Sequence, residues 1–499
     1  MNRHQLLVAS LLSVLCLAPS AQAKKKTVGE LLSQANQGSR GGKTQMSKTD
    51  TSLPSANMGF NQPVNSVNLE SVKPPRSSEI MQRDAGGGDK AEYERVLDQQ
   101  IQELYKLTQK FKTSSNRGEL WLRLAELYVE KAGLIDGRKQ DEYDAKLRAF
   151  QSGKTKKKPI LNTEEAREYN RKAVQLYEWF QRDFPRDEKM SQALFFLGYN
   201  YFELGDVQKG AHYYEELTKR FPESPFVGEA HFALGEYYFE NERWAPAYKE
   251  YTPLIKDKKH RLHTFALYKG AWCLFRLDRV QQGMTYLEYI IKSGRAETGE
   301  QVGGKKVNRT RLEGEALRDI VTFYAEGGDP AKAASYFKDL VGGDINSYLE
   351  KLAYQYSDRG NKEASRDVFK LLISQNPTSP KAFEYQYQIV QNFYYAKNTT
   401  RFKDELYGWV KDYDTKSAWY TQNKAKTELV ENSQKLRETT LRNYVLQQHQ
   451  TAQNSRAPYS QSQAYEGYQL YLREFPESAM IGDMHFYYGE LLYDMQKYD

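Results

Sequence analysis

The chain has 499 residues, which is long enough for about three globular domains or for one array of repeats. Hydrophobic residues make up 39% of it, and beyond the N-terminal segment no stretch approaches the roughly 18 consecutive apolar residues of a membrane-spanning helix. The net charge is +7, but most of the surplus of basic residues lies before residue 89. The nearly neutral body argues against a nucleic-acid-binding protein.

Residues 1–23 have the three parts of a cleavable secretory signal peptide. A positive start precedes an apolar run from Leu6 to Ala18. A small-x-small end at Ala21 and Ala23 is typical of a cleavage site. After cleavage, we expect no transmembrane helix.

The two cysteines bear on the expected location of the protein. Cys16 is an alternative lipidation site, but Leu15 stands where lipoprotein signals usually place Gly, Ala or Ser. Only Cys273 remains after cleavage, so the mature chain cannot form an intramolecular disulfide. Its apolar neighbours favour a buried side chain over a reactive thiol. We expect an exported protein of the periplasm, either free or associated with the outer membrane.

Residues 24–88 are rich in Lys, Ser, Gln, Asn, Gly and Pro and contain few aromatic residues. Such a segment cannot bury enough apolar surface to offset its conformational entropy. We therefore predict a disordered basic linker. The glycine triplet at 86–88 belongs to this linker and not to a phosphate-binding loop.

The segment 89–116 follows as a predicted helix with an apolar seam. The residues of the seam recur at intervals of four and three, namely Leu97, Ile101, Leu104, Thr108 and Phe111. Such a seam is suited to packing against another helix. It predicts either a capping helix on the first repeat or self-association through a short coiled coil of residues 89–111.

The strongest pattern is a helix pair that recurs along residues 117–377. In one copy, Leu194, Leu197, Gly198 and Tyr201 lie on one helical face, and the small residue lets a second helix approach closely. That second helix carries large residues and a terminating proline, namely Tyr214, Leu217 and Pro222. The same order returns around Ala125, Gly235, Ala271, Val321 and Ala353.

This layout resembles the tetratricopeptide repeat in the residues that define it. The resemblance covers roughly residues 117–499 and implies an all-α fold, a right-handed superhelical α-solenoid of helix pairs. The segments 221–224 and 475–478 both read Phe-Pro-Glu-Ser, which is similar to the repeat variant of periplasmic and outer-membrane-associated proteins of Gram-negative bacteria. The general arrangement also loosely resembles exported repeat proteins of gliding-motility machines.

Two insertions interrupt the predicted array, at residues 137–160 and 293–309. Insertions in solenoids fall on connecting loops, which are often functional. The first insertion contains a run of basic residues, Lys154, Lys156, Lys157 and Lys158. This run is either a solvated loop or a contact for an anionic lipid headgroup or an acidic protein.

The repeat pattern degrades over residues 378–460. There, Ala418 to about Gln453 predicts one long polar helix, which ends at a loop around Pro458. Residues 461–499 restore the pattern, and the sequence stops at Asp499 in the turn where a second helix should begin. We therefore expect the sequence to be the N-terminal part of a longer protein.

The first helices of three successive repeats carry a candidate partner-binding face. Its residues are spaced i, i+4, i+7 in each repeat, namely Phe195, Tyr199 and Phe202, then Phe232, Glu236 and Phe239, then Tyr268, Trp272 and Phe275. Stacking of the repeats aligns the aromatic residues into a ladder. The ladder predicts either an open concave groove that binds a peptide or helix, or rings that neighbouring repeats bury.

No catalytic constellation is recognisable in the sequence. His260 and His263 are neighbours in a basic context without a third ligand, so we expect no metal site. We also expect no cofactor and no enzymatic activity. The favoured function is a scaffold that binds other envelope proteins or peptides, and the alternative is a peptidoglycan-associated binding or hydrolase-accessory protein.

Overall fold

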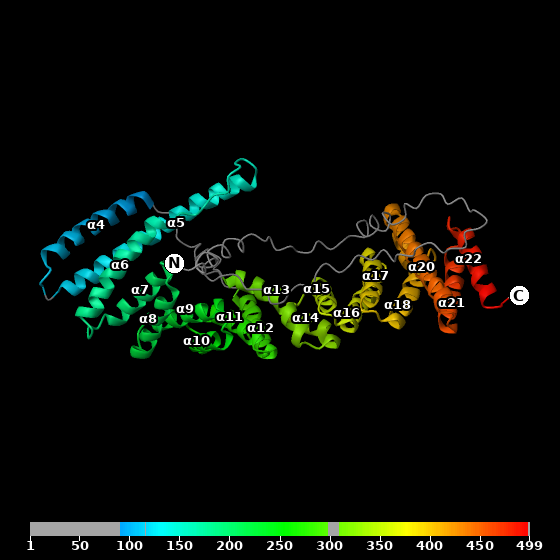
Figure 1. Cartoon of the computed structure of the whole chain (residues 1–499). Coiled ribbons are helices and arrows are strands. Elements are labelled where there is room, and N and C mark those ends of the chain that lie inside the picture. The colour runs from blue at the N-terminus through cyan, green and yellow to red at the C-terminus, as the bar shows by residue number, and fades with distance from the viewer. Residues whose placement is uncertain (1–89, 115, 298–308, 498–499) are drawn as a thin grey trace. The chain divides into compact units, whose positions relative to one another are not determined.

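The computed structural model describes residues 90–497 except 115 and 298–308, and within that part all regular elements are helical (Figure 1). The predicted all-α class of stacked helix pairs is confirmed. The expectations for residues 1–23 and 24–88, and most of the insertion at 293–309, lie outside the described residues. None of the described helices is both long and apolar enough to cross a membrane.

The described residues form two compact units, 90–327 and 328–497. Figure 1 shows the first unit in blue to green, as helices that follow one another in antiparallel pairs. Its helices are α4 (Lys90–Lys110), α5 (Arg117–Gln151), α6 (Glu164–Asp183), α7 (Met190–Glu203), α8 (Val207–Arg220), α9 (Val227–Glu240), α10 (Trp244–Lys256), α11 (His263–Arg276), α12 (Val280–Glu297) and α13 (Arg309–Gly327).

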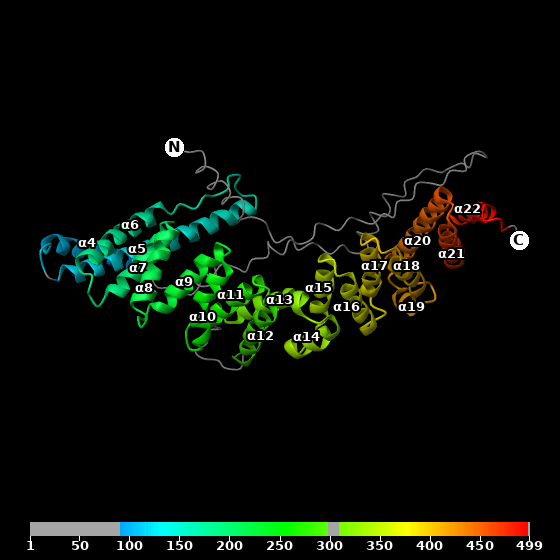
Figure 2. The ribbon, with the colours of Figure 1, turned by 60° about the horizontal axis from the view of Figure 1, so that its bottom comes forward.

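The second unit is by itself also built of successive helices, which the turned view in Figure 2 shows in yellow-green to red. It begins with a short 3₁₀ turn, η2 (Pro330–Lys332), followed by α14 (Ala333–Val341) and α15 (Asn346–Asp358). Its other helices are α16 (Lys362–Gln375), α17 (Pro380–Tyr395), α18 (Thr399–Asp412), α19 (Ala418–Asn423), α20 (Thr427–Ser455), α21 (Pro458–Glu474) and α22 (Ile481–Asp494).

In the pairs α7–α8 and α9–α10, a large side chain of the second helix packs against a small residue of the first helix. A Cβ atom added at Gly198 would lie closer than 3.0 Å to the ring of Tyr214, and one added at Gly235 would meet Tyr251 in the same way. Both tyrosines are buried. The glycines thus set the close approach of α7 to α8 and of α9 to α10.

The turns inside the pairs share one backbone geometry. Their central residue has a positive φ between 55° and 85°, at Gly205, Glu242, Asp278, Gly360 and Lys397. The N–H of the next residue then donates to the carbonyl five residues earlier, as from Asp206 to Tyr201 at 2.9 Å and from Arg243 to Tyr238 at 2.9 Å. This is the Schellman arrangement, which satisfies the last carbonyls of the first helix.

The predicted insertion at 137–160 is largely helical, because α5 continues without interruption to Gln151. Only residues 152–163 form the connection to α6. At the N-terminal end of the unit, α4 packs on α5 through Leu97 and Ile101. The buried Lys131 of α5 fixes this contact with ion pairs to Glu94 and Asp98, at 2.9 Å and 2.7 Å.

The long helix predicted from Ala418 to Gln453 is wrong, because two helices, α19 and α20, occupy this stretch. The side-chain amide of the buried Asn423 donates to the carbonyls of Thr378 and Trp419, at 2.7 Å and 2.9 Å. The indole N–H of Trp419 donates to Ser379 at 2.8 Å. These bonds tie α19 to the preceding turn, so the chain bends before α20 begins.

Candidate partner-binding surfaces

The nine residues of the predicted partner-binding face lie on α7, α9 and α11, but most of them are covered. Five are buried, namely Phe232, Phe239, Tyr268, Trp272 and Phe275. Phe195, Phe202 and Glu236 are half-buried, and Tyr199 is 36% exposed. The open aromatic ladder is therefore absent on α9 and α11, where neighbouring helices supply the contacts.

On α9, side chains of α10 and Lys269 of α11 cover the predicted residues. The ring of Phe232 lies 5.7 Å from Tyr251, and Phe239 meets Trp244 edge-on at 5.1 Å. Glu236 accepts hydrogen bonds from the Tyr251 hydroxyl and from the Lys269 ammonium at 3.0 Å. These contacts fill the space that a partner segment was expected to occupy.

On α11, the covering helix is α13. The Tyr268 hydroxyl and the Trp272 indole N–H both donate to the Asp319 carboxylate, at 2.6 Å and 3.1 Å. Phe275 packs on Phe323 with ring centroids 4.6 Å apart. Burial raises the pKa of Asp319 to about 6, although the two hydrogen bonds oppose this rise. No sequence pattern indicated Asp319, because its partners lie about 50 residues earlier in the chain.

Tyr199 on α7 is the most accessible of the nine predicted residues. Phe195 stacks on Phe226 at 5.0 Å, and Phe202 stacks on Tyr214 at 5.6 Å, so both rings remain half-buried beside it. Together, Phe195, Tyr199 and Phe202 form a partly exposed aromatic strip along α7, which we call the α7 face.

Two carboxyl groups lie close enough to the α7 face to affect its electrostatics. Loss of solvation raises the pKa of Glu203 at the end of α7, and the Asp136 carboxylate on α5 raises it further. Burial likewise raises the pKa of Asp136, and the charge of Arg167 on α6 opposes the rise at both carboxyl groups. The sequence could have indicated Glu203, which is four residues from Tyr199 on the same helical face, but not Asp136.

Two other predicted contacts lie on exposed surface. Lys154, Lys156, Lys157 and Lys158 are exposed in the connection between α5 and α6. Tyr93, Val96, Tyr105 and Leu107 of α4, and Phe111 just after it, are also exposed. The anionic contact and the self-association through residues 89–111 stay predictions.

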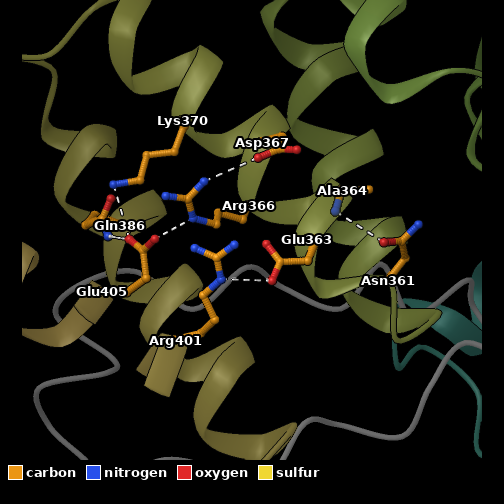
Figure 3. Close-up of polar contacts among 9 residues, drawn as sticks. All are labelled: Asn361, Glu363, Ala364, Arg366, Asp367, Lys370, Gln386, Arg401 and Glu405. Carbon is orange, nitrogen blue, oxygen red and sulfur yellow. Dashed lines mark hydrogen bonds and ion pairs between the residues drawn. The ribbon is translucent and has the colours of Figure 1, made fainter. Parts of the chain in front are cut away.

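In the second unit, several charged side chains converge on Glu405 of α18, as Figure 3 shows. Its carboxylate accepts from Arg366 of α16 and from Gln386 of α17 at 2.7 Å, and Lys370 of α16 lies at 3.2 Å. Burial would raise the pKa of Glu405, but these partners lower it. A carboxylate held as an anion by three donors suits the joining of three helices, not proton transfer.

No group of three or more side chains that could hold a metal ion gathers within the described residues. His260 and His263 instead contact backbone, since the Leu262 N–H lies 3.1 Å from His260 Nδ1 and the Leu254 carbonyl 3.0 Å from His263 Nδ1. Burial raises the pKa of the Cys273 thiol well above its usual range, which opposes thiolate formation.

The helix pairs α7–α8 and α9–α10 coincide with a known repeat. Residues 195–252 match the family model described as tetratricopeptide repeat. These residues therefore have the sequence pattern of tetratricopeptide repeats. The predicted repeat family is confirmed by this match, whereas the resemblance to periplasmic and gliding-motility repeat proteins stays a prediction.

No curated protein matches the chain. Among solved structures, it is similar to a tetratricopeptide repeat protein from Parabacteroides merdae, with 13% identity, a TM-score of 0.26, and coverage of 71% of this chain and 100% of that one. It is also similar to Naa15/Naa10 bound to HypK-THB, with 14% identity, a TM-score of 0.29, and coverage of 81% and 61%. A third similar structure is the assembly chaperone of RpL4, with 12% identity, a TM-score of 0.22, and coverage of 62% of this chain and 97% of that one. Such low TM-scores support no functional inference.

Proposed function

We propose that this chain is a non-enzymatic scaffold that binds a segment of a partner protein on the α7 face. The tetratricopeptide repeats carry the proposal, because this fold generally serves protein–protein interaction. Among the described residues, the polar cluster around Glu405 joins neighbouring helices through hydrogen bonds, which supports a structural role for it and not a catalytic one.

The α7 face favours a partner segment with a basic residue next to an apolar one. Tyr199 supplies a partly exposed aromatic anchor between two half-buried rings. The pKa of Glu203 and that of Asp136 are raised although Arg167 of α6 already opposes the rise, so a further nearby positive charge would stabilise the ionised form of both carboxyl groups. A Lys or Arg of the partner would provide that charge.

The proposed location is the periplasm, and the proposed setting is an envelope or outer-membrane-associated assembly such as a motility complex. The signal-peptide pattern of residues 1–23 supports export. The Phe-Pro-Glu-Ser ends of second helices support the envelope setting through their similarity to envelope-associated repeat proteins. The partners would then be other envelope proteins or peptides.

Affinity capture from envelope fractions tests the proposal. The mature chain from residue 24 onwards is the bait, and Tyr199→Ala is the test variant. Tyr289→Ala is the matched control, because Tyr289 is a similarly exposed tyrosine, 42% accessible, on the second helix α12. We expect a specific partner that Tyr199→Ala loses and Tyr289→Ala retains.

Sedimentation with purified cell wall distinguishes this proposal from the alternative of a peptidoglycan-associated protein. A scaffold for proteins should remain in the supernatant, whereas a peptidoglycan-associated protein should sediment with the wall. Sedimentation together with identical capture by all three baits would contradict the proposal.

A further inference from the structure

Helix α5 extends well beyond the helices that pack on it. Glu165, near the start of α6, pairs with Arg138 and Lys139 of α5, both at 3.5 Å. Residues 140–151 therefore continue past the start of α6, by about 18 Å at the rise of an α-helix. Figure 1 shows this end of α5, in cyan, extending past α6 and α7. No residue from 136 to 163 is buried, so packing does not explain the length of the helix.

A tight turn ends α5 and sets the position of the basic run. Gly153 has a φ of 75°, and the N–H of Lys154 donates to the carbonyl of Ala149, five residues earlier, at 2.9 Å. This Schellman arrangement satisfies the last carbonyls of the helix through the backbone. The lysine side chains that follow are therefore not needed as caps of α5.

Residues 152–163, which we call the α5 tip, form a purely basic surface. Its four lysines, Lys154, Lys156, Lys157 and Lys158, are all exposed, and none of them forms an ion pair with another described residue. No Asp or Glu occurs between Asp144 and Glu164. Like charges this close repel one another, so an anionic surface against the tip would be favourable.

Apolar side chains are exposed at the same tip. Ile160 is 86% exposed, more than any other large hydrophobic residue in the described part of the chain, and Leu161 is 38% exposed. Contact of these side chains with an apolar phase would remove them from water, which is favourable. The α5 tip thus combines unpaired positive charge with an uncovered apolar residue.

The composition of the α5 tip favours a lipid surface over an acidic protein. Protein interfaces usually depend on Trp, Tyr or Arg anchors in packed pockets, and residues 152–163 contain none of these residue types. Lysine attracts anions as a hydrated point charge, without the fixed fork geometry of arginine. Such attraction suits the spread charge of anionic headgroups, and a neighbouring apolar side chain suits the boundary between headgroups and acyl chains.

We propose that the α5 tip binds the surface of an anionic membrane. The four lysines lie over the negatively charged headgroups, and Ile160 enters the bilayer interface beside them. Binding at such an interface grows with the buried apolar area and with the attraction to anionic lipids, and the tip supplies both. The proposal adds a membrane contact to the proposed scaffold and does not depend on the α7 face.

Co-flotation of the chain from residue 24 onwards with lipid vesicles tests this inference. The vesicles contain equal parts of phosphatidylglycerol and phosphatidylcholine, and vesicles of phosphatidylcholine alone are the neutral control. Replacement of all four lysines by Gln should weaken binding to the anionic vesicles by about tenfold or more, because each lysine near the surface contributes. Ile160→Ser, which keeps every charge, should weaken it by about fivefold.

The end of α10 and its connection to α11 offer a matched control. They carry four exposed basic residues, Lys256, Lys258, Lys259 and Arg261. However, Asp257 lies among them, Arg261 pairs with Glu229 at 3.0 Å, and no large hydrophobic residue is exposed there. Replacement of these four residues by Gln removes the same charge from the chain, and binding should stay within about twofold of the unaltered protein.

A fluorophore at position 160 reports directly on insertion. Ile160→Cys can be labelled selectively, because Cys273 is the only other cysteine after residue 24 and is buried. An environment-sensitive dye at this position should shift to shorter wavelength with the anionic vesicles and not with the neutral ones. The same dye on Val207→Cys, which replaces an apolar residue that is 39% exposed at the start of α8, should not shift.

Equal binding to anionic and neutral vesicles, or equal loss in the two four-residue variants, would overturn the proposal. The same dye response at positions 160 and 207 would overturn it too. If neither kind of vesicle binds and the four-lysine variant loses a captured protein, an acidic protein would occupy the tip instead. Loss of vesicle binding with the α7-face partner retained would separate this failure from failure of the proposed function.

Discussion

Single glycines decide how closely the helices of a pair approach. Gly198 and Gly235 each face a buried tyrosine ring, and the sequence predicted this close approach from the spacing of small and large residues. The pattern placed Tyr214 among the large residues of the second helix, but it did not predict which of them lies over Gly198. The choice of the covering side chain depends on how the second helix packs on the first, which local spacing in the sequence does not determine.

Gly235→Ala and Gly489→Ala should therefore have opposite effects on stability. The new Cβ at position 235 would overlap the ring of Tyr251, and overpacking of this kind costs roughly 1–3 kcal/mol. At position 489 the Cβ meets nothing, so better helix propensity should leave stability unchanged or raise it by up to about 1 kcal/mol. Urea unfolding measures both, and equal destabilisation would contradict this account.

His449 should make the stability of the second unit depend on pH. Burial lowers its pKa from 6.5 to about 4, and its Nδ1 lies 2.8 Å from the Tyr468 hydroxyl. The unfolded chain therefore takes up a proton at a higher pH than the folded one does. The stabilisation is complete above about pH 6.5 and is lost as pH falls towards about 4.

Between about pH 7 and about pH 5, this linkage should remove roughly 2 kcal/mol of stability. His449→Gln, which cannot titrate, should flatten that part of the profile. Urea unfolding across this pH range is the measurement. Parallel profiles for the two proteins would show that His449 is not the source.

At the scale of elements, the first-helix pattern identified the helices correctly but not which faces stay open. Helix α13 follows residues 298–308, and its Asp319 and Phe323 close over α11. The spacing within α11 alone cannot indicate this. For the same reason the break between α19 and α20 was missed, since it depends on bonds from Asn423 and Trp419 to an earlier turn.

Phe275→Ser and Tyr199→Ser should differ in their effect on stability. Phe275 is buried on Phe323, and loss of a buried phenylalanine costs about 3–5 kcal/mol. Tyr199 is partly exposed, so its replacement should cost about 1 kcal/mol or less. Thermal unfolding followed by circular dichroism compares them. Similar losses would mean that Tyr199 is a packing residue and not part of a binding face.

The cluster around Glu405 should stabilise the junction of α16, α17 and α18. Glu405→Ala leaves Arg366 without its main partner, and breaking a buried ion pair costs about 3–5 kcal/mol. The control is Glu363→Ala, because Glu363 forms an exposed pair with Arg401 at 3.1 Å, worth about 1 kcal/mol at most (Figure 3). Hydrogen exchange of the three helices would reveal the difference, and equal exchange would contradict the proposed role.

At the scale of the whole molecule, the repeat order predicted from sequence agrees with the observed succession of helix pairs in each unit. A repeat needs only local spacing to be recognised, which explains this agreement. Partner surfaces depend on which faces later helices leave uncovered.

The central claim is that the α7 face binds a protein segment, and photo-crosslinking in cells tests it most directly. A photoreactive phenylalanine derivative at position 199 should form an adduct with a partner, and one at position 289 should not. Mass spectrometry should map the adduct to a segment with Lys or Arg beside an apolar residue. The same adducts at both positions, or none at position 199, would contradict the claim.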